Sequence, residues 1–315
     1  MASLASKPDG VNIIKDSNLI PFLFMGCWNR DDTPRSSVAK AIIDNPIKTL
    51  ILGGDNVYPE KIKIGNSLDF TKIYSLKTLM DGVHMLQGKE IYAALGNHNV
   101  SEPILKTQLS LPEWTLPSRY YSVDFLDYSL IVIDTSLIDT DMFDVMVGWL
   151  SKKVKALHEL SKKYYYVQHD PFMSFKKHKQ TLLPKINELF NILSSYPPTA
   201  ILCADTHNFQ TGTLNVNGVS IPQYVVGTGG ADPDYVKAAI GSSFHSKPDN
   251  IHNIIYTMDT YIPGYGYLQI DNNETTFIKV ENWRSYEGKG GRRHKTHKKK
   301  IRRFKKSRKL RKLKH

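Results

Sequence analysis

Short runs of apolar, β-branched and aromatic residues recur along the chain, and each run ends in small or polar residues. Such runs are typical of buried β-strands. After about residue 211 they outnumber helical patterns, so we expect the late part of the chain to be mainly strands. The strands are expected at residues 19–25, 49–52, 91–95, 120–125, 130–133, 164–167, 200–203, 224–226, 267–270 and 276–280.

Helical patterns lie between several of these runs. Thr33 followed by Pro34 is typical of a helix start, which predicts a helix to about residue 43. Apolar residues at spacings of three and four predict further helices at 70–81, 142–161 and 175–193. Strands that alternate with helices predict an α/β protein built on β-sheets.

The positive charge of the chain is concentrated at its C-terminal end. The formal net charge of the 315 residues is +12, but residues 288–315 hold 16 of the 42 Lys and Arg residues and no Asp or Glu. Residues 1–287 therefore carry 26 basic and 30 acidic side chains, so net charge does not mark the folded part as a nucleic-acid binder. We expect a folded domain over 1–287 and a basic, disordered tail over 288–315.

The expected location is intracellular. Cys27 and Cys203 are too few for a disulfide scaffold, and the N-terminus, MASLASKPDG, lacks the apolar core of a signal peptide. The longest apolar stretch, around residues 19–27, is too short to span a membrane. These features favour the cytoplasm or nucleus. The composition of the tail resembles that of proteins of large DNA viruses, which adds the virion as a location.

Five of the predicted strands are followed at once by residues that can bind metals or phosphate. In open α/β sheets the ligand site lies beyond the carboxyl ends of the strands, so we expect these residues to converge. One such cluster is weak evidence, whereas five in sequence order indicate a common site. The clusters are GCWN at 26–29, GGDNVY at 53–58, GNHN at 96–99, QHDP at 168–171 and ADTHN at 204–208.

The side chains in these clusters form a mixture of hard and borderline ligands. They are the carboxylates Asp55 and Asp205, the imidazoles His98, His169 and His207, the amide Asn97, the phenol Tyr58 and the thiol Cys27. This mixture suits Fe, Mn or Zn better than Ca or Mg alone, and one bridging carboxylate is enough for two metal ions. Two ions about 3.5–4 Å apart can activate a hydroxide and hold phosphoryl oxygens during in-line attack.

The order and wording of the clusters resemble the calcineurin-like metallophosphoesterases, and most of all their purple acid phosphatase branch. That branch has a GDWG-like block where this chain has GCWN, a GDNxY block where it has GDNVY, and a GNHD block where it has GNHN. Its GHYP and CGHDHNLQ blocks correspond to QHDP at 168–171 and CADTHNFQ at 203–210. The resemblance covers roughly residues 19–283 and leaves out the tail.

The resemblance implies a four-layer αββα sandwich, in which two mixed β-sheets pack together with helices outside. It also implies which residues hold the metal ions. Asp55 would bridge both ions, Tyr58 and His207 would hold the first, and Asn97 and His169 would hold the second. A tyrosine ligand to Fe(III) is what colours the purple branch, so iron is considered beside zinc and manganese.

The implied activity is that of an acid phosphatase-like, metal-dependent phosphoric-ester hydrolase. A metal-bridging hydroxide would attack the phosphorus of a phosphoester substrate. Asn97 and the metal ions would orient the phosphoryl oxygens, and His98 would assist departure of the alcohol.

Five residues depart from the family pattern. Gln168 and Ala204 replace glycines, and the other three lie at ligand or catalytic positions. Cys27 stands where the family has a first-metal aspartate, Asp205 where it has a second-metal histidine, and Asn99 where an aspartate follows the catalytic histidine. A thiolate and a carboxylate can still bind metal, and sulfur favours Zn or Fe. Asp31 and Asp32 are another source of the missing carboxylate. A retuned metal pair and a degenerate site that has lost one metal both stay open.

Each candidate also has a structural interpretation. The GDNVY and GNHN clusters suit polar turns after strands, and His169 and His207 suit hydrogen-bonded core histidines. Cys27 alone would be a small buried hydrophobe, and Asp205 suits an Asx-turn. The five clusters in order favour the metal site.

Three functional hypotheses follow. The first is the phosphoesterase, and the second is a degenerate member of the fold that binds a partner or one ion without turnover. The third makes the basic tail the main functional part, with salt-dependent binding to nucleic acid or another polyanion. The tail also suits a nuclear-targeting signal.

Overall fold

The computed structural model describes residues 9–30, 33–58, 61–64, 67–70, 72–177, 179–246, 253–272 and 274–281. The predicted domain boundary at 287/288, the tail, and Asp31 and Asp32 lie outside these residues. Within the described part of the chain, no helix combines the length and the apolar character needed to cross a membrane.

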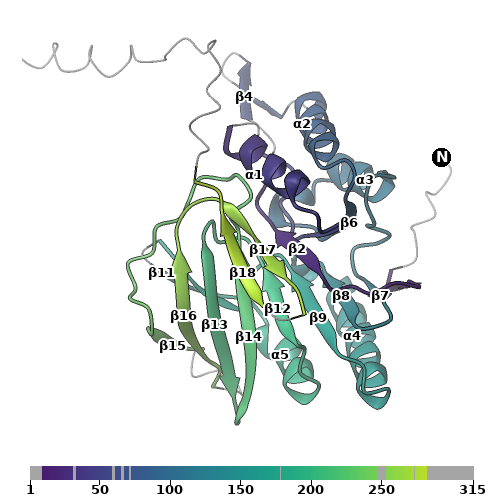
Figure 1. The fold of residues 1–315 in the computed structure, drawn as a ribbon, viewed down its shortest axis with the longest axis vertical. Helices are drawn as coiled ribbons and strands as arrows, with labels where there is room; N and C mark the ends of the chain where they lie inside the picture. Colours follow the sequence, from purple (N-terminus) through teal and green to yellow (C-terminus); the bar gives the residue numbers. More distant parts are fainter. Residues whose placement is uncertain are drawn as a thin grey trace, which may run out of the picture. The chain divides into compact units, whose positions relative to one another are not determined.

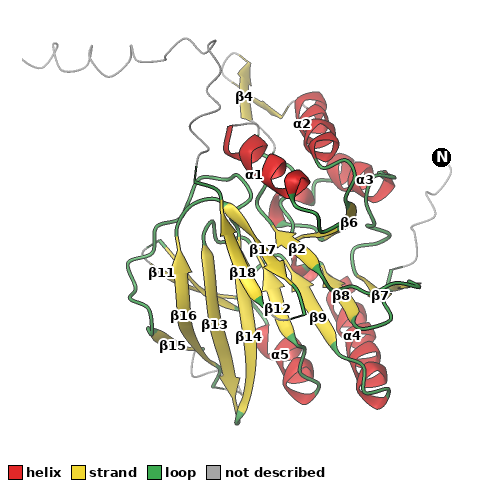
Figure 2. Ribbon diagram, viewed as in Figure 1, coloured by secondary structure: helices red, strands yellow, loops and turns green. Residues whose placement is uncertain are grey.

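Nine strands form a large mixed sheet (Figures 1 and 2). In spatial order they are β1 (Val11–Ile14), β7 (Tyr121–Asp124), β8 (Ser129–Ile133), β9 (Tyr164–Gln168), β12 (Ala200–Cys203), β14 (Val219–Val226), β13 (Phe209–Val216), β16 (Ile255–Ile262) and β15 (Ser243–His245). The strands β8, β9, β12 and β14 run parallel, whereas β14, β13 and β16 pair antiparallel. Every residue of β8, β9 and β12 is buried, as their continuous apolar runs predict.

Five strands form a second mixed sheet. They are, in spatial order, β18 (Thr275–Lys279), β17 (Gly266–Ile270), β2 (Phe22–Met25), β3 (Thr49–Leu52) and β6 (Glu90–Ala93). The strands β2, β3 and β6 run parallel, so their carboxyl ends lie at the same edge. Two hairpins form separate small sheets: β4 (Lys61–Ile64) with β5 (Ser67–Phe70), and β10 (Met173–Lys176) with β11 (Lys179–Leu182).

Helices cover the outer faces of the two sheets (Figure 2). The large sheet is covered by α4 (Met142–Glu159) and α5 (Ile186–Ser195), and the small sheet by α1 (Thr33–Asp44), α2 (Lys72–Met85) and α3 (Glu102–Ser110). Alternate side chains of β8 pack on opposite faces of the large sheet. Leu130 and Val132 belong to the hydrophobic cluster that includes the small sheet. Ile131 and Ile133 belong to the cluster that includes α4 and α5. The predicted αββα sandwich is confirmed.

Most predicted elements are present. The strands predicted at 49–52 and 200–203 form with those bounds, the other predicted strands overlap observed ones, and the helix predicted at 142–161 is α4. The short helix α3 was not predicted, because only Ile104 and Gln108 are buried along it and the apolar pattern is too weak.

The helix predicted at 175–193 is wrong in its first half. Residues 173–176 and 179–182 form the paired strands β10 and β11, and α5 begins only at Ile186. Pro184 has no N–H to donate and disfavours helical backbone at Leu183, so one continuous helix is excluded there. Met173 and Phe175 are instead buried from a strand. The hairpin includes Lys176, whose contacts are described with the candidate metal centre below.

Candidate metal centre

Loops from both sheets meet at the carboxyl ends of their parallel strands. The loops after β2, β3 and β6 come from the small sheet, and those after β9 and β12 come from the large one. Cys27 N donates to Gly54 O at 3.0 Å, and Ala204 N donates to His169 O at 2.8 Å. His169 Nδ1 lies 2.8 Å from Gly53 O and so links a large-sheet loop to a small-sheet loop.

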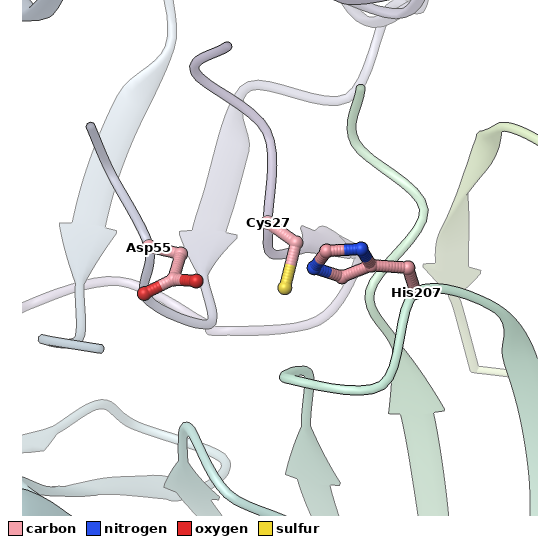
Figure 3. Close-up of side chains that lie close together, drawn as sticks. All are labelled: Cys27, Asp55 and His207. Carbon is pink, nitrogen blue, oxygen red and sulfur yellow. The ribbon is translucent and has the colours of Figure 1, made fainter. Parts of the chain in front are cut away.

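Three of the predicted ligands converge on one point. Cys27, Asp55 and His207 offer a sulfur, a carboxylate oxygen and a ring nitrogen that all lie within 4.8 Å of one another. Figure 3 shows the sulfur of Cys27 between the carboxylate of Asp55 and the ring of His207. Cys27 is fully buried and Asp55 is 2% exposed. Sulfur, oxygen and nitrogen donors at this spacing suit a single zinc or iron ion.

Backbone strain marks three of these loops. Cys27, Asp55 and Asp205 have left-handed φ angles of 52°, 52° and 44°. This conformation costs an L-residue roughly 1–2 kcal/mol, so the surrounding structure must hold it in place. Strained backbone of this kind clusters at functional sites, and here it recurs in loops from both sheets.

Two glycines allow the loops to approach each other. A Cβ atom on Gly96 would lie 2.3 Å from Asp55 N and 2.4 Å from Asp55 Oδ1. A Cβ atom on Gly54, which has φ +91°, would lie 2.7 Å from His169 Nδ1. Any larger residue at either position would push Asp55 and His169 apart.

Both candidate histidine ligands have one ring nitrogen fixed by a backbone carbonyl. His169 Nδ1 bonds to Gly53 O, and His207 Nδ1 bonds to Asp232 O at 3.0 Å. A proton on each Nδ1 leaves a lone pair on Nε2. Metal-ligating histidines are oriented in this way by their outer partners. Burial also lowers the pKa of His207, which favours the neutral ring that can bind a metal.

His169 presents an unsatisfied atom to the shared carboxylate. His169 Nε2 is buried, has no hydrogen-bond partner among the residues that the structure describes, and lies 3.5 Å from Asp55 Oδ1. Burial lowers the pKa of His169, but the charges of Asp55, Asp170 and Asp205 outweigh it, so the pKa is raised. These carboxylates therefore favour a positive charge beside Nε2, and either a proton or a metal ion meets that demand.

The phenol oxygen of Tyr58 is also buried, and within the described part of the chain it has no hydrogen-bond partner. Burial raises the pKa of Tyr58 well above its usual value, and the nearby Cys27 and Asp55 raise it further. Burial, with Asp55 and Asp205, likewise raises the pKa of the Cys27 thiol. A bound cation reverses these effects and favours the thiolate and the phenolate. The donor set around Asp55 therefore fits a metal ion.

Asp205 has a different partner. Lys176 Nζ, at the end of β10, lies 2.8 Å from Asp205 Oδ2, and both side chains are about a quarter exposed, at 25% and 22%. Burial raises the pKa of Asp205, but the charges of His169 and Lys176 outweigh it and lower the pKa. A lysine therefore already neutralises the carboxylate of this predicted ligand.

The GNHN cluster forms the 3₁₀ turn η1 (Asn97–Asn99) after β6. Asn97 and His98 are exposed, and His98 N donates to Asp55 Oδ1 at 3.2 Å. The rings of His98 and Tyr58 have centroids 4.9 Å apart. Asn97 and His98 therefore lie at the solvent side of the turn.

Asn99, which departs from the family pattern, is fully buried. Its Oδ1 accepts hydrogen bonds from Asn56 N at 3.0 Å and Gly96 N at 2.9 Å, and its Nδ2 donates to Val57 O at 3.1 Å. The amide therefore joins the loops after β3 and β6, and a carboxylate could not make the third bond.

Sequence reasoning missed two residues near the site. Lys176 was placed in a predicted helix, which gave no reason to look for it beside Asp205. Asp234 is 1% exposed; its carboxylate accepts from His207 N at 3.2 Å and lies 3.2 Å from Lys177 Nζ. No strand run ends directly before Asp234, so the pattern used for the other clusters could not find it.

No family model matches the chain. In sequence, the chain is 26% identical over 219 residues to human tartrate-resistant acid phosphatase type 5. The matched region covers 60% of this chain and 63% of the human protein, so the chain spans just under two thirds of that relative.

Three solved structures resemble the chain at 10–13% identity, and each match covers 83% of it. A purple acid phosphatase from yellow lupin seeds has a TM-score of 0.56, with 50% of that chain covered. A dimetal phosphatase from Danio rerio has a TM-score of 0.51, with 99% covered. GAP50, described as the anchor in the inner membrane complex of Plasmodium, has a TM-score of 0.57, with 85% covered.

The fold is that of the calcineurin-like metallophosphoesterases. The sequence match to an acid phosphatase confirms the predicted resemblance to the purple acid phosphatase branch. The metallophosphoesterase fold itself is shared by phosphatases and by a protein described as an anchor. Fold alone therefore does not decide between catalysis and binding, and that decision falls on the site residues.

Proposed function

We propose that the protein is a metal-dependent phosphoesterase whose site holds two metal ions. The observation that carries this proposal is the geometry around Asp55. The thiol of Cys27 and the ring of His207 offer donor atoms within 4.8 Å of its carboxylate, and His169 Nε2, which has no hydrogen-bond partner among the described residues, lies 3.5 Å from Asp55 Oδ1. One carboxylate shared by these two sets of donors suits a pair of ions.

The ligands divide between two positions. Cys27, Tyr58 and His207, with Asp55, would hold the first ion. Asn97, His169 and Asp205, with Asp55, would hold the second. The thiolate favours zinc or iron at the first position, and manganese fits the second position better, where the donors are oxygen and nitrogen. The metals, when bound, supply positive charge to the phosphoryl oxygens and a nucleophilic water near neutral pH.

The protein's own residues position the substrate and move the proton. Asn97, whose side chain is exposed, can donate its amide N–H to a phosphoryl oxygen. A ring nitrogen of His98 can protonate the leaving oxygen of the alcohol. The bond from His98 N to Asp55 Oδ1 fixes the turn that carries both side chains relative to the shared carboxylate.

The sequence relatives favour catalysis over the degenerate alternative, because they are acid phosphatases. The departures at Cys27 and Asp205 keep metal-binding chemistry, and Asn99 has a structural role in the loops. Binding of nucleic acid or another polyanion by residues 288–315, and a cytoplasmic, nuclear or virion location, stay predictions.

The test is the isosteric change Asp55→Asn. Metal content by elemental analysis and hydrolysis of p-nitrophenyl phosphate should fall together, because the shared carboxylate is lost. Asp139→Asn, at an exposed position, is the matched control and should leave both unchanged. Undiminished metal and turnover in Asp55→Asn would refute the mechanism. A wild-type protein that takes up metal but hydrolyses no phosphoester would support the degenerate alternative.

A further inference from the structure

Lys176 is held in the site by the fold. Its strand, β10, is bonded to the segment that follows Asp205. Ser174 Oγ lies 3.0 Å from Thr206 Oγ1, and Gln210 both donates to Phe175 O at 2.7 Å and accepts from Phe175 N at 3.1 Å. These buried contacts place the next residue, Lys176, beside Asp205.

The contact between Lys176 and Asp205 involves two atoms of the aspartate. Lys176 Nζ lies 2.8 Å from the carboxylate and 3.4 Å from the backbone oxygen of Asp205. The strained backbone of Asp205, with φ 44°, presents both oxygens to the ammonium group. The ammonium group also carries its positive charge close to Cys27 and Asp234.

We propose that Lys176 competes with the second metal ion for Asp205, so that the two metal positions differ strongly in affinity. This inference rests on the proposed function and specifies its metal centre. The first position has the charged ligands Cys27 and Asp55. The second shares Asp55 and otherwise has the neutral His169 and Asn97, since the charge of Asp205 is already neutralised.

The physical reason is charge repulsion. A metal ion that binds Asp205 must approach an ammonium group 2.8 Å from the same carboxylate. In a half-buried site such repulsion is screened far less than in water. The second ion therefore binds weakly and exchanges, while the first stays bound. Lys176 is a positioning residue in this scheme, because it acts through Asp205.

Cobalt(II) titration of the metal-free, full-length protein distinguishes the two positions. A thiolate-to-cobalt charge-transfer band reports only the position that contains Cys27, and isothermal titration calorimetry reports total binding. In the wild type, we expect one equivalent of cobalt(II) to bind tightly and to increase the intensity of the charge-transfer band. We expect a second equivalent of cobalt(II) to bind at least roughly tenfold more weakly and to add no intensity to this band.

Lys176→Met should tighten the second equivalent by roughly ten- to a hundredfold and leave the band unchanged, because one positive charge is removed beside Asp205. Lys176→Arg keeps the charge and should keep the second step weak. Lys177→Met is the matched control: it removes the same charge from the neighbouring residue, whose partner is Asp234, and should change the second step little.

If Lys176→Met fails to fold, Asp205→Asn provides a second test. This variant should lose binding of the second cobalt(II) equivalent and should retain the charge-transfer band of the first. Two equal equivalents in the wild type, or a second step that Lys176→Met leaves unchanged, would overturn the inference and leave the proposed function standing. No cobalt binding and no thiolate band would overturn the proposed function itself.

Discussion

The change Asn99→Asp restores the residue type of the family pattern, and the structure predicts that it damages the site. Asn99 Nδ2 donates to Val57 O at 3.1 Å. A carboxylate oxygen in that place faces a carbonyl oxygen and cannot donate. The two backbone bonds to Oδ1 survive, so the loss is concentrated in one contact of a fully buried side chain.

The expected magnitude follows from this single contact. One lost hydrogen bond plus an unpaired buried carbonyl costs about 2–3 kcal/mol of the free energy of unfolding. For a domain of this size, that lowers the melting temperature by roughly 3–5 °C. The loss should shrink at low pH, because a protonated carboxyl group regains a donor for Val57 O.

Differential scanning calorimetry at acidic and neutral pH measures the effect, with p-nitrophenyl phosphate hydrolysis measured in parallel. Asn191→Asp, the same change at an exposed position of α5, should leave the melting temperature nearly unchanged. An Asn99→Asp protein with unchanged melting temperature and a higher rate would refute the reasoning. Asn99 would then mark a lost catalytic carboxylate and not a structural amide.

Two further predictions concern the same loops. Gly96→Ala should weaken zinc binding by roughly tenfold or more in calorimetric titrations, because the new Cβ would lie 2.3 Å from Asp55 N. Gly148→Ala, where nothing lies within 4 Å, should slightly stabilise α4, and equal zinc affinities in the two variants would contradict the close approach. The affinity for the second zinc ion should rise as pH rises through the pKa of His169, which the carboxylates of Asp55, Asp170 and Asp205 raise, because protons and metal compete for Nε2. His169→Gln should bind zinc more weakly and lose this part of the pH dependence; an unchanged pH profile would exclude His169 as a ligand.

The sequence alone determined the elements that depend on local pattern. The runs at 49–52 and 200–203 are strands because their residues are apolar and suit a sheet buried on both faces. The candidate ligands were found for a related reason. Each lies in a polar cluster that follows the end of such a strand, and parallel strands bring those ends to one edge.

Only the tertiary structure decided which candidates meet and what each one contacts. The convergence of Cys27, Asp55 and His207 joins residues up to 180 positions apart, and no local pattern carries such a distance. The sequence predicts a helix for the segment that brings Lys176 to Asp205, because its apolar residues recur at helical spacing. The segment forms a hairpin instead, because burial against the large sheet outweighs that spacing. From the sequence, Asn99 is a departure from a family carboxylate. In the structure, its side chain makes three hydrogen bonds that join two loops. Side-chain roles in a buried site depend on neighbours that the chain supplies from distant segments, and packing alone sets those neighbours.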